Sequence, residues 1–212
     1  MTRNRIKISV VLLSAAALLF LFHSDAKAAG PVESFLQKMN SSLVEFTYSF
    51  STKGNMTIKG DGKATVQGDS FFVDGNGMEI YCDGKSRWTV DSYSKEAIIE
   101  DVSEVGQDFL TNPAAFLSSF DKVFGEPKMS KGTFSGKSAD VASFLPIGKS
   151  NVSSMKMFFA QGELLGAELS LVDGSVTEFK VSGMNFLPVD KEKVFSFKDK
   201  DLDSSWVVTD LR

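Results

Sequence analysis

Apolar and polar residues alternate along most of this sequence, and pairs of turn-forming residues interrupt the alternation. In residues 43–50, the apolar residues Val44, Phe46, Tyr48 and Phe50 alternate with acidic and hydroxyl residues. A period of two places successive side chains on opposite faces of a strand, so this pattern indicates a strand with one buried face. The chain is therefore predicted to fold mainly into β-sheet.

The same pattern recurs often enough to predict about ten antiparallel strands. Asp83-Gly84 and Asp173-Gly174 are tight hairpin turns. Gly60 and Gly62 interrupt the second strand, which favours a bend or a bulge there. A sheet of this size must curl, fold over or close. The predicted strands cover residues 43–50, 56–67, 70–73, 78–82, the return strand that contains Trp88 and Val90, 96–102, 155–160, 164–172, 175–183, 194–198 and 206–211.

Two helices are predicted among these strands. A short one covers residues 31–40. The second begins at Asn112-Pro113, because asparagine is a good N-cap and proline is favoured at the first helical position. Aromatic residues then follow at helical spacing, including Phe116 and Phe120, so this helix has one strongly aromatic face.

The first 28 residues have the pattern of a secretory signal peptide. Basic residues precede the apolar run Ile8 to Phe22, and Ala26-Lys27-Ala28 forms a cleavage site before Ala29. The run is too short for a spanning helix, and no cysteine follows the cleavage point as a lipid anchor would require. We therefore expect an exported, soluble mature protein in which residues 29–212 form a single domain.

The charge and the histidine content of the mature chain narrow its chemistry. Cleavage removes four of 23 basic residues, one of 27 acidic residues and the only histidine, which leaves a net charge of −7. An acidic chain without a basic block is a poor nucleic-acid binder. Histidine-dependent catalysis and most zinc sites are excluded. The paired carboxylates Glu96 and Glu100 are interpreted as solvated charge, and we expect no enzyme, metal or cofactor.

Three further features have plain structural explanations. Residues 132–138, GTFSGKS, resemble a phosphate-binding loop, but the spacing before the Gly-Lys pair is too short. Asp199, Asp201 and Asp203 start like a calcium loop, but Ser204 stands where glycine is needed. Cys82, the only cysteine, is expected to be a buried small hydrophobe, with an intermolecular or redox role as the alternative.

The order of these elements resembles the periplasmic lipoprotein carrier LolA and its relatives over essentially the whole mature chain. The resemblance lies in the short helix, the strand SLVEFTYSF, the glycine-containing IKGDGKATVQGDSFF, the meander EIYCDGKSRWTVDSYSKEAII and the Asn-Pro helix. The most specific piece is the turn Asp83-Gly84-Lys85 with Trp88 three residues later. The later hairpins and the Asp190 ending with Phe195 and Phe197, displaced by one residue, also fit the family.

The resemblance implies a mainly β fold with a few helices: an open, strongly curved antiparallel sheet that forms an incomplete β-barrel, with a helical lid over an apolar cavity. It also implies a monomeric periplasmic carrier that binds the acyl chains of lipoproteins. Such a carrier takes its cargo from an inner-membrane exporter to an outer-membrane acceptor. The alternatives on the same fold are an envelope sensor or scaffold and a carrier of another amphiphile, such as a glycolipid or fatty acid.

Strand alternation and the resemblance together select candidate lipid-binding residues, for each of which ordinary core packing is the alternative. The candidates are Phe46, Tyr48, Ile58, Val66, Phe72, Ile80, Trp88, Phe159, Leu169, Leu171, Phe179 and Val181 from the sheet, with Phe116 and Phe120 from the lid. The family's Lys-Arg-Pro sequence, whose arginine ties the lid to the sheet, is absent. Gln67-Gly68-Asp69 stands at that place, so this latch is not carried over.

Overall fold

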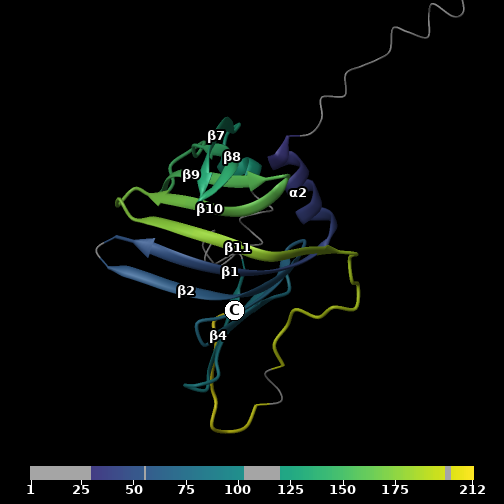
Figure 1. The fold of residues 1–212 in the computed structure, drawn as a ribbon. Helices are drawn as coiled ribbons and strands as arrows, with labels where there is room; N and C mark the ends of the chain where they lie inside the picture. Colours follow the sequence, from purple (N-terminus) through teal and green to yellow (C-terminus); the bar gives the residue numbers. More distant parts are fainter. Residues whose placement is uncertain (1–29, 55, 103–119, 199–201) are drawn as a thin grey trace, which may run out of the picture. The chain divides into compact units, whose positions relative to one another are not determined.

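A computed structural model describes residues 30–54, 56–102, 120–198 and 202–212 (Figure 1). Contacts divide the chain into Met1–Gly30 and Pro31–Arg212, and the elements below belong to the second unit. The predicted signal peptide, the Asn112-Pro113 helix start, Phe116, Asp199 and Asp201 lie outside the described residues. In the described part of the chain, no helix is both long and apolar enough to span a bilayer.

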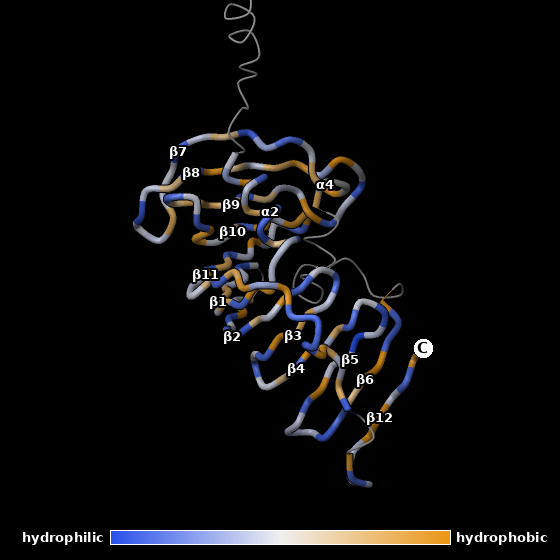
Figure 2. Tube along the Cα trace, turned by 90° about the vertical axis from the view of Figure 1, so that its right-hand side faces the viewer, coloured by the Kyte–Doolittle hydropathy of each residue, from blue (hydrophilic) through white to orange (hydrophobic). Residues whose placement is uncertain are grey.

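The described residues form one sheet of twelve strands. Its order is β12-β6-β5-β4-β3-β2-β1-β11-β10-β9-β8-β7, so β7 and β12 are edges and the sheet is open (Figure 2). The strands are β1 (Leu43–Lys53), β2 (Thr57–Gln67), β3 (Ser70–Gly75), β4 (Met78–Cys82), β5 (Ser86–Asp91), β6 (Glu96–Asp101), β7 (Lys128–Phe134), β8 (Lys137–Phe144), β9 (Val152–Ala160), β10 (Glu163–Leu171), β11 (Val176–Leu187) and β12 (Val207–Asp210). The helices are α2 (Pro31–Ser41) and α4 (Phe120–Val123). The predicted mainly β fold class with an open sheet is confirmed.

Three predictions about individual strands were wrong. Residues 194–198 are not a strand, although Phe195 is buried and Phe197 contacts Tyr81, because alternate side chains can pack without a backbone ladder. Strands β7 and β8 were missed because β7 is a polar edge strand. The GTFSGKS stretch covers the end of β7, the tight turn at Ser135 and Gly136, where φ is positive, and the start of β8. Strand β12 pairs with β6 in parallel, not antiparallel.

One face of the sheet, here called the inner face, holds the main hydrophobic core. Helix α2 buries Val32, Phe35 and Met39 in this core. It contacts β2 and β10, which are separated in the sheet by β1 and β11, so the helix crosses four strands. The ring of Phe35 meets that of Phe159 edge to face, with the centroids 5.9 Å apart. The helix therefore covers the inner face where β1 begins.

The opposite, outer face carries two smaller clusters. Trp88, Val90, Ala97 and Ile99 from β5 and β6 pack with Tyr81 and with two residues of the C-terminal segment, Phe197 and Trp206. We define the C-terminal segment as residues 188–198 and 202–212. The other outer cluster consists of Phe134, Ala139, Val141 and Phe158, with Leu165 against it. Apolar residues on both faces explain why several strands have weak alternation of burial.

Candidate functional site

The inner face brings together most of the candidate residues. Core residues and half-buried residues occur side by side there, since the same cluster holds fully buried Val44 and half-buried Phe46. Eight of the fourteen candidates belong to this cluster: Phe46, Tyr48, Val66, Ile80, Phe120, Phe159, Leu169 and Leu171.

Glycines on β2 and β3 let two aromatic side chains lie along the inner face. A Cβ added at Gly60 would stand 2.6 Å from the ring of Phe50, and one at Gly62 would stand 2.8 Å from the Tyr48 hydroxyl oxygen. The register between β1 and β2 runs without a break from Val44 to Lys53, so of the predicted bend or bulge at these glycines, the bulge is absent. Their role is to make room for aromatic rings on the sheet surface.

Phe179 and Val181 extend the inner face along β11. Phe179 pairs with Phe50 and their ring centroids are 5.9 Å apart, whereas half-buried Val181 pairs with Tyr48. Ile58 pairs with Thr52 two residues beyond Gly60, and more than half of its surface is exposed. Phe179 is therefore a buried residue of this face, whereas Val181 and Ile58 are the more exposed candidates at this end of the apolar surface.

Phe72 and Trp88 lie on the outer face, which corrects their assignment to a cavity shared with Ile80. Phe72 pairs with Tyr81, and Tyr81 pairs with Trp88. Cross-strand partners share a face, so these three form one row (the rings of Phe72 and Tyr81 are 4.8 Å apart). Ile80 is one residue from Tyr81 and therefore points to the other side. A one-residue offset in a strand moves a side chain to the opposite face.

Several residues of the inner cluster were not among the candidates, including one of its most deeply buried side chains. Phe71, one residue before Phe72, is fully buried in the inner cluster. Two consecutive phenylalanines look alike in isolation, but the alternation of Phe71 with Val73 is the sequence signal that identifies Phe71 as the buried one. Other inner-face residues that were missed are Met155 and Met157 on β9, and Met184 and Phe186 on β11.

Arg87 and Glu100 form an ion pair on the inner face of β5 and β6. Arg87 pairs with Cys82 across the sheet, and its Nη2 donates to Glu100 Oε2 at 2.6 Å. Both side chains are mostly buried, with 12% and 27% of their surface exposed. The interpretation of Glu100 as simply solvated is therefore wrong, since it is the partner of an arginine at the edge of the core.

Cys82 is a buried residue with a free thiol, as expected from its sequence context. Its sulfur lies 3.7 Å from the Asp69 carbonyl oxygen and accepts from the Gly84 amide at 3.4 Å. Burial raises the pKa of the Cys82 thiol, which disfavours the reactive thiolate. In the described residues, no group of three or more metal-ligating side chains occurs.

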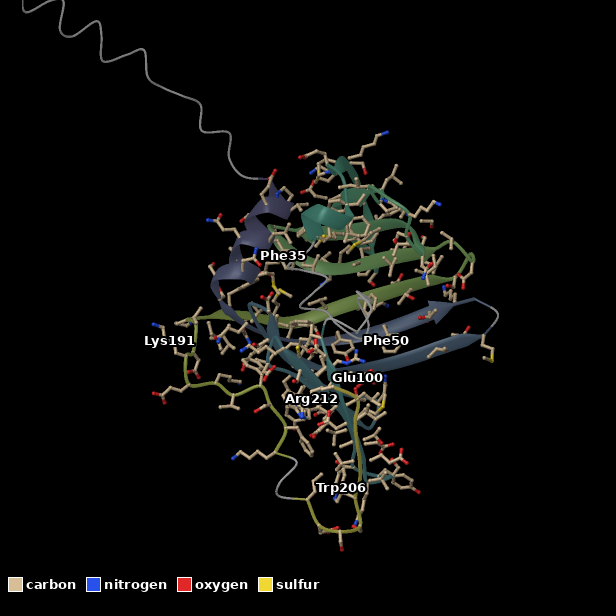
Figure 3. The ribbon with its side chains drawn as sticks, turned by 180° about the vertical axis from the view of Figure 1, so that it is seen from behind. Phe35, Phe50, Glu100, Lys191, Trp206 and Arg212 are labelled. Carbon is tan, nitrogen blue, oxygen red and sulfur yellow. The ribbon has the colours of Figure 1, made fainter. Side chains whose placement is uncertain are left out.

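Gln67, at the place of the missing family latch, holds the start of the C-terminal segment. Its side-chain amide donates to the Asp190 carbonyl oxygen at 2.9 Å and accepts from the Asp190 amide at 2.8 Å. Two opposed bonds of this kind imitate a pair of ladder hydrogen bonds. Further along the segment, Lys95 Nζ donates to Ser205 Oγ at 2.7 Å, and Figure 3 shows Trp206 and Arg212 on this part of the chain.

Tyr81 gives a pH-dependent test of the outer-face row. Burial, followed by the hydrogen bond from its hydroxyl to Glu79 Oε2 at 3.0 Å, raises the pKa of Tyr81 to about 12. A phenol with a raised folded-state pKa stabilises the fold below the unfolded pKa of about 10, and this contribution is lost as the pH rises toward 12. Urea unfolding of the wild type is expected to show a steeper loss of stability over this range than Tyr81→Phe. Equal slopes would contradict the burial of this hydroxyl.

A groove of about 870 Å³ is present where β1, β2, β10 and β11 meet. Its charged lining residues have mixed signs: Lys53, Lys59, Asp61, Glu168, Glu178 and Lys180. The Lys180 and Glu178 side chains lie 3.6 Å apart, and Glu168 pairs with Lys156 at 2.7 Å. Because positive and negative side chains balance in this groove, it has no preference for an anionic or a cationic ligand. The inner face remains the candidate site.

Comparison with known proteins places this chain among proteins of similar fold. No protein-family model and no curated protein matches the sequence. An uncharacterized conserved protein from Thermus thermophilus has a TM-score of 0.52 and 9% identity, over 84% of this chain and 95% of its own. The likeness is one of fold.

Two further solved structures have lower TM-scores. A LolA superfamily protein from Nitrosomonas europaea has 14% identity and a TM-score of 0.42, over 81% of this chain and all of its own. A putative outer membrane lipoprotein-sorting protein domain from Vibrio parahaemolyticus has 12% identity and a TM-score of 0.39, over 75% and 92% of the two chains. The open sheet with a helix across one face is the architecture that the sequence resemblance implies.

Proposed function

We propose that this protein is a non-catalytic periplasmic carrier that binds the acyl chains of lipoproteins on its inner face. The supporting observation is the apolar surface that continues beyond the packed core. Phe46, Tyr48 and Phe186 are only partly buried although they contact the core. A core alone needs no such row of half-covered rings. An acyl chain laid on them would remove further apolar surface from water, at about 0.8 kcal/mol for each methylene group.

The side chains of this surface suit a flexible, variable ligand. Partly buried Met184 contributes an unbranched thioether side chain to this surface, whereas Met155 and Met157 are buried in the core. Methionine adapts its shape to irregular partners. The glycines beneath Tyr48 and Phe50 leave these rings lying over the sheet rather than locked between strands. In the proposed cycle, an inner-membrane exporter supplies the lipoprotein and an outer-membrane acceptor removes it.

Two matched substitutions on opposite faces test the proposal. Phe46→Ser removes a half-buried ring from the inner face, and Phe72→Ser removes a half-buried ring from the outer face. With a diacylated lipopeptide in equilibrium binding, Phe46→Ser is expected to weaken affinity by about 10- to 100-fold, the equivalent of one buried aromatic side chain. Phe72→Ser is expected to change it by less than about threefold.

The ligand class is resolved in the same experiment. The wild type is presented with the lipopeptide, a free fatty acid and a glycolipid, and lipids extracted from the purified protein are identified by mass spectrometry. Tighter binding of the lipopeptide than of the other two ligands supports the proposal that the protein carries lipoproteins. A preference for either other ligand shows a carrier of another amphiphile. An equal loss in both variants, or no saturable binding of any of them, would refute an inner-face site.

A further inference from the structure

Three neighbouring loops at one end of the sheet carry exposed apolar side chains. The loops are the β1–β2 turn, the β10–β11 turn and the β8–β9 loop. Each of five aliphatic or methionine side chains has more than half of its surface exposed, from 56% for Ile58 to 76% for Met56. We call these five residues the apolar rim: Met56, Ile58, Leu145, Ile147 and Val172.

The three loops lie side by side. A Cβ added at Gly54 would stand 3.1 Å from the Cβ of Ser175, so the first two turns touch. The Val172 amide donates to the Asn151 carbonyl oxygen at 2.9 Å, which joins the second turn to the third loop. Figure 1 shows the turns of β1–β2 and β10–β11 at the same end of the sheet. The rim residues therefore lie on neighbouring loops at one end of the sheet.

The backbone of the β8–β9 loop is held in place although its apolar side chains face water. The Ile147 amide donates to the Val123 carbonyl oxygen at 2.9 Å, and the Leu145 carbonyl oxygen accepts from the Gly125 amide at 3.1 Å. Phe124 and Pro146 form a β-bridge between these bonds. A fixed backbone that presents leucine and isoleucine to solvent costs free energy in water, and contiguous exposed apolar surface marks an interaction site.

The segments that carry most of the rim are basic, although Asp61 and Glu178 line the groove that also contains Lys53 and Lys59. Exposed Lys53 and Lys59 flank the β1–β2 turn, and exposed Lys149 follows Ile147. Residues 51–60 and 145–151 contain no acidic residue. Asp173 is the acidic residue of the β10–β11 turn, and its carboxylate accepts from the Ser175 amide and hydroxyl at 2.9 and 2.7 Å.

We propose that the apolar rim docks the protein on a negatively charged lipid bilayer. Apolar side chains that enter the acyl region, flanked by lysines at headgroup level, are the chemistry of interfacial membrane binding. Exposed apolar side chains on separate loops with lysines beside them fit a charged bilayer better than a protein partner. The inner face reaches this end of the sheet at Ile58 and Phe50, so docking would bring the apolar surface to the bilayer. This proposal stands whether or not the ligand of the inner face is a lipoprotein.

Vesicle co-sedimentation of the mature protein tests the rim. The vesicles contain equal parts of phosphatidylcholine and phosphatidylglycerol, with pure phosphatidylcholine for comparison. The triple variant Met56→Ser, Leu145→Ser, Ile147→Ser is expected to bind the anionic vesicles at least about tenfold more weakly than the wild type. The matched control replaces Val189, Val194 and Leu211, three exposed aliphatic residues outside the rim, with serine and is expected to bind within about twofold of the wild type.

A second variant set tests the charge. Replacing Lys53, Lys59 and Lys149 with glutamine is expected to weaken binding to anionic vesicles by about tenfold or more. The same change at Lys63, Lys85 and Lys137, which are also exposed, should have a smaller effect. Thermal melts establish that all variants fold, and lipopeptide binding in solution is measured in parallel. If the rim variants lose vesicle binding but still bind the lipopeptide, membrane docking and ligand binding are separate functions of the protein.

Several results would overturn docking. One is a wild type that binds neither vesicle, and another is an equal loss of binding in rim and control variants. A third is concentration-dependent self-association in sedimentation velocity that disappears with the rim substitutions, because the rim would then be an interface between copies of this chain.

Discussion

Phe71→Ala is expected to lower the free energy of unfolding by about 3–5 kcal/mol, the usual cost of removing a fully buried aromatic side chain. Phe71 is completely inaccessible and lies in the inner core with Val66, Val73 and Cys82. Alanine would leave a cavity among strands that are fixed by their ladders and cannot collapse into it. Urea unfolding of the wild type and the variant measures the change.

Phe72→Ala is the matched control for this substitution. The same residue type, one position later, lies half-buried on the outer face against Tyr81, so we expect a loss of about 1–2 kcal/mol. The comparison tests the register directly. A larger loss for Phe72 than for Phe71 would mean that the faces of β3 are exchanged.

Gly166→Ala is expected to destabilise the protein by about 3 kcal/mol, because the added methyl group has no room. Its Cβ would stand 2.1 Å from the Phe179 carbonyl oxygen and 2.6 Å from the Phe134 ring. The first contact is with the backbone of β11, so relief would require β10 and β11 to separate. The second would displace Phe134 from its stacked neighbour Phe158, whose ring centroid is 4.5 Å away.

Gly148→Ala controls for the general effect of replacing a glycine. An added Cβ there has no heavy atom within 4 Å, and the stability should change by less than about 1 kcal/mol. Thermal or urea unfolding of both variants gives the comparison. If Gly166→Ala is as stable as Gly148→Ala, the close approach of β10, β11 and Phe134 is not present in solution.

Most strands could be predicted because their side chains alternate between environments of different polarity. In β1, Val44, Phe46 and Tyr48 share the inner face as the alternation indicates. Sequence reasoning failed where both faces are apolar. In β3 to β5, inner Ile80 and outer Tyr81 are both hydrophobic, so alternation showed a strand but not which side faced the cavity. Trp88 and Phe72 were misplaced for this reason.

The C-terminal segment could not be placed from the sequence because its contacts are distant along the chain. Phe195 and Phe197 alternate like strand residues, but Phe197 packs against Tyr81 and Trp206 rather than in a strand ladder. Likewise, nothing near Gln67 indicates that it binds the Asp190 backbone. The β7–β8 hairpin gave a weak signal because β7 is an exposed, polar edge strand, although β8 buries Ala139, Val141, Ala142 and Phe144.

The hydrogen bonds between Gln67 and Asp190 have a consequence for how the chain acquires its native state. They connect residues 123 positions apart, and Phe197 and Trp206 of the same segment pack against the outer cluster that contains Trp88. Contacts at such separation close late, since a long loop must first be ordered. Before Phe197 and Trp206 dock, the aromatic cluster around Trp88 therefore lacks part of its cover.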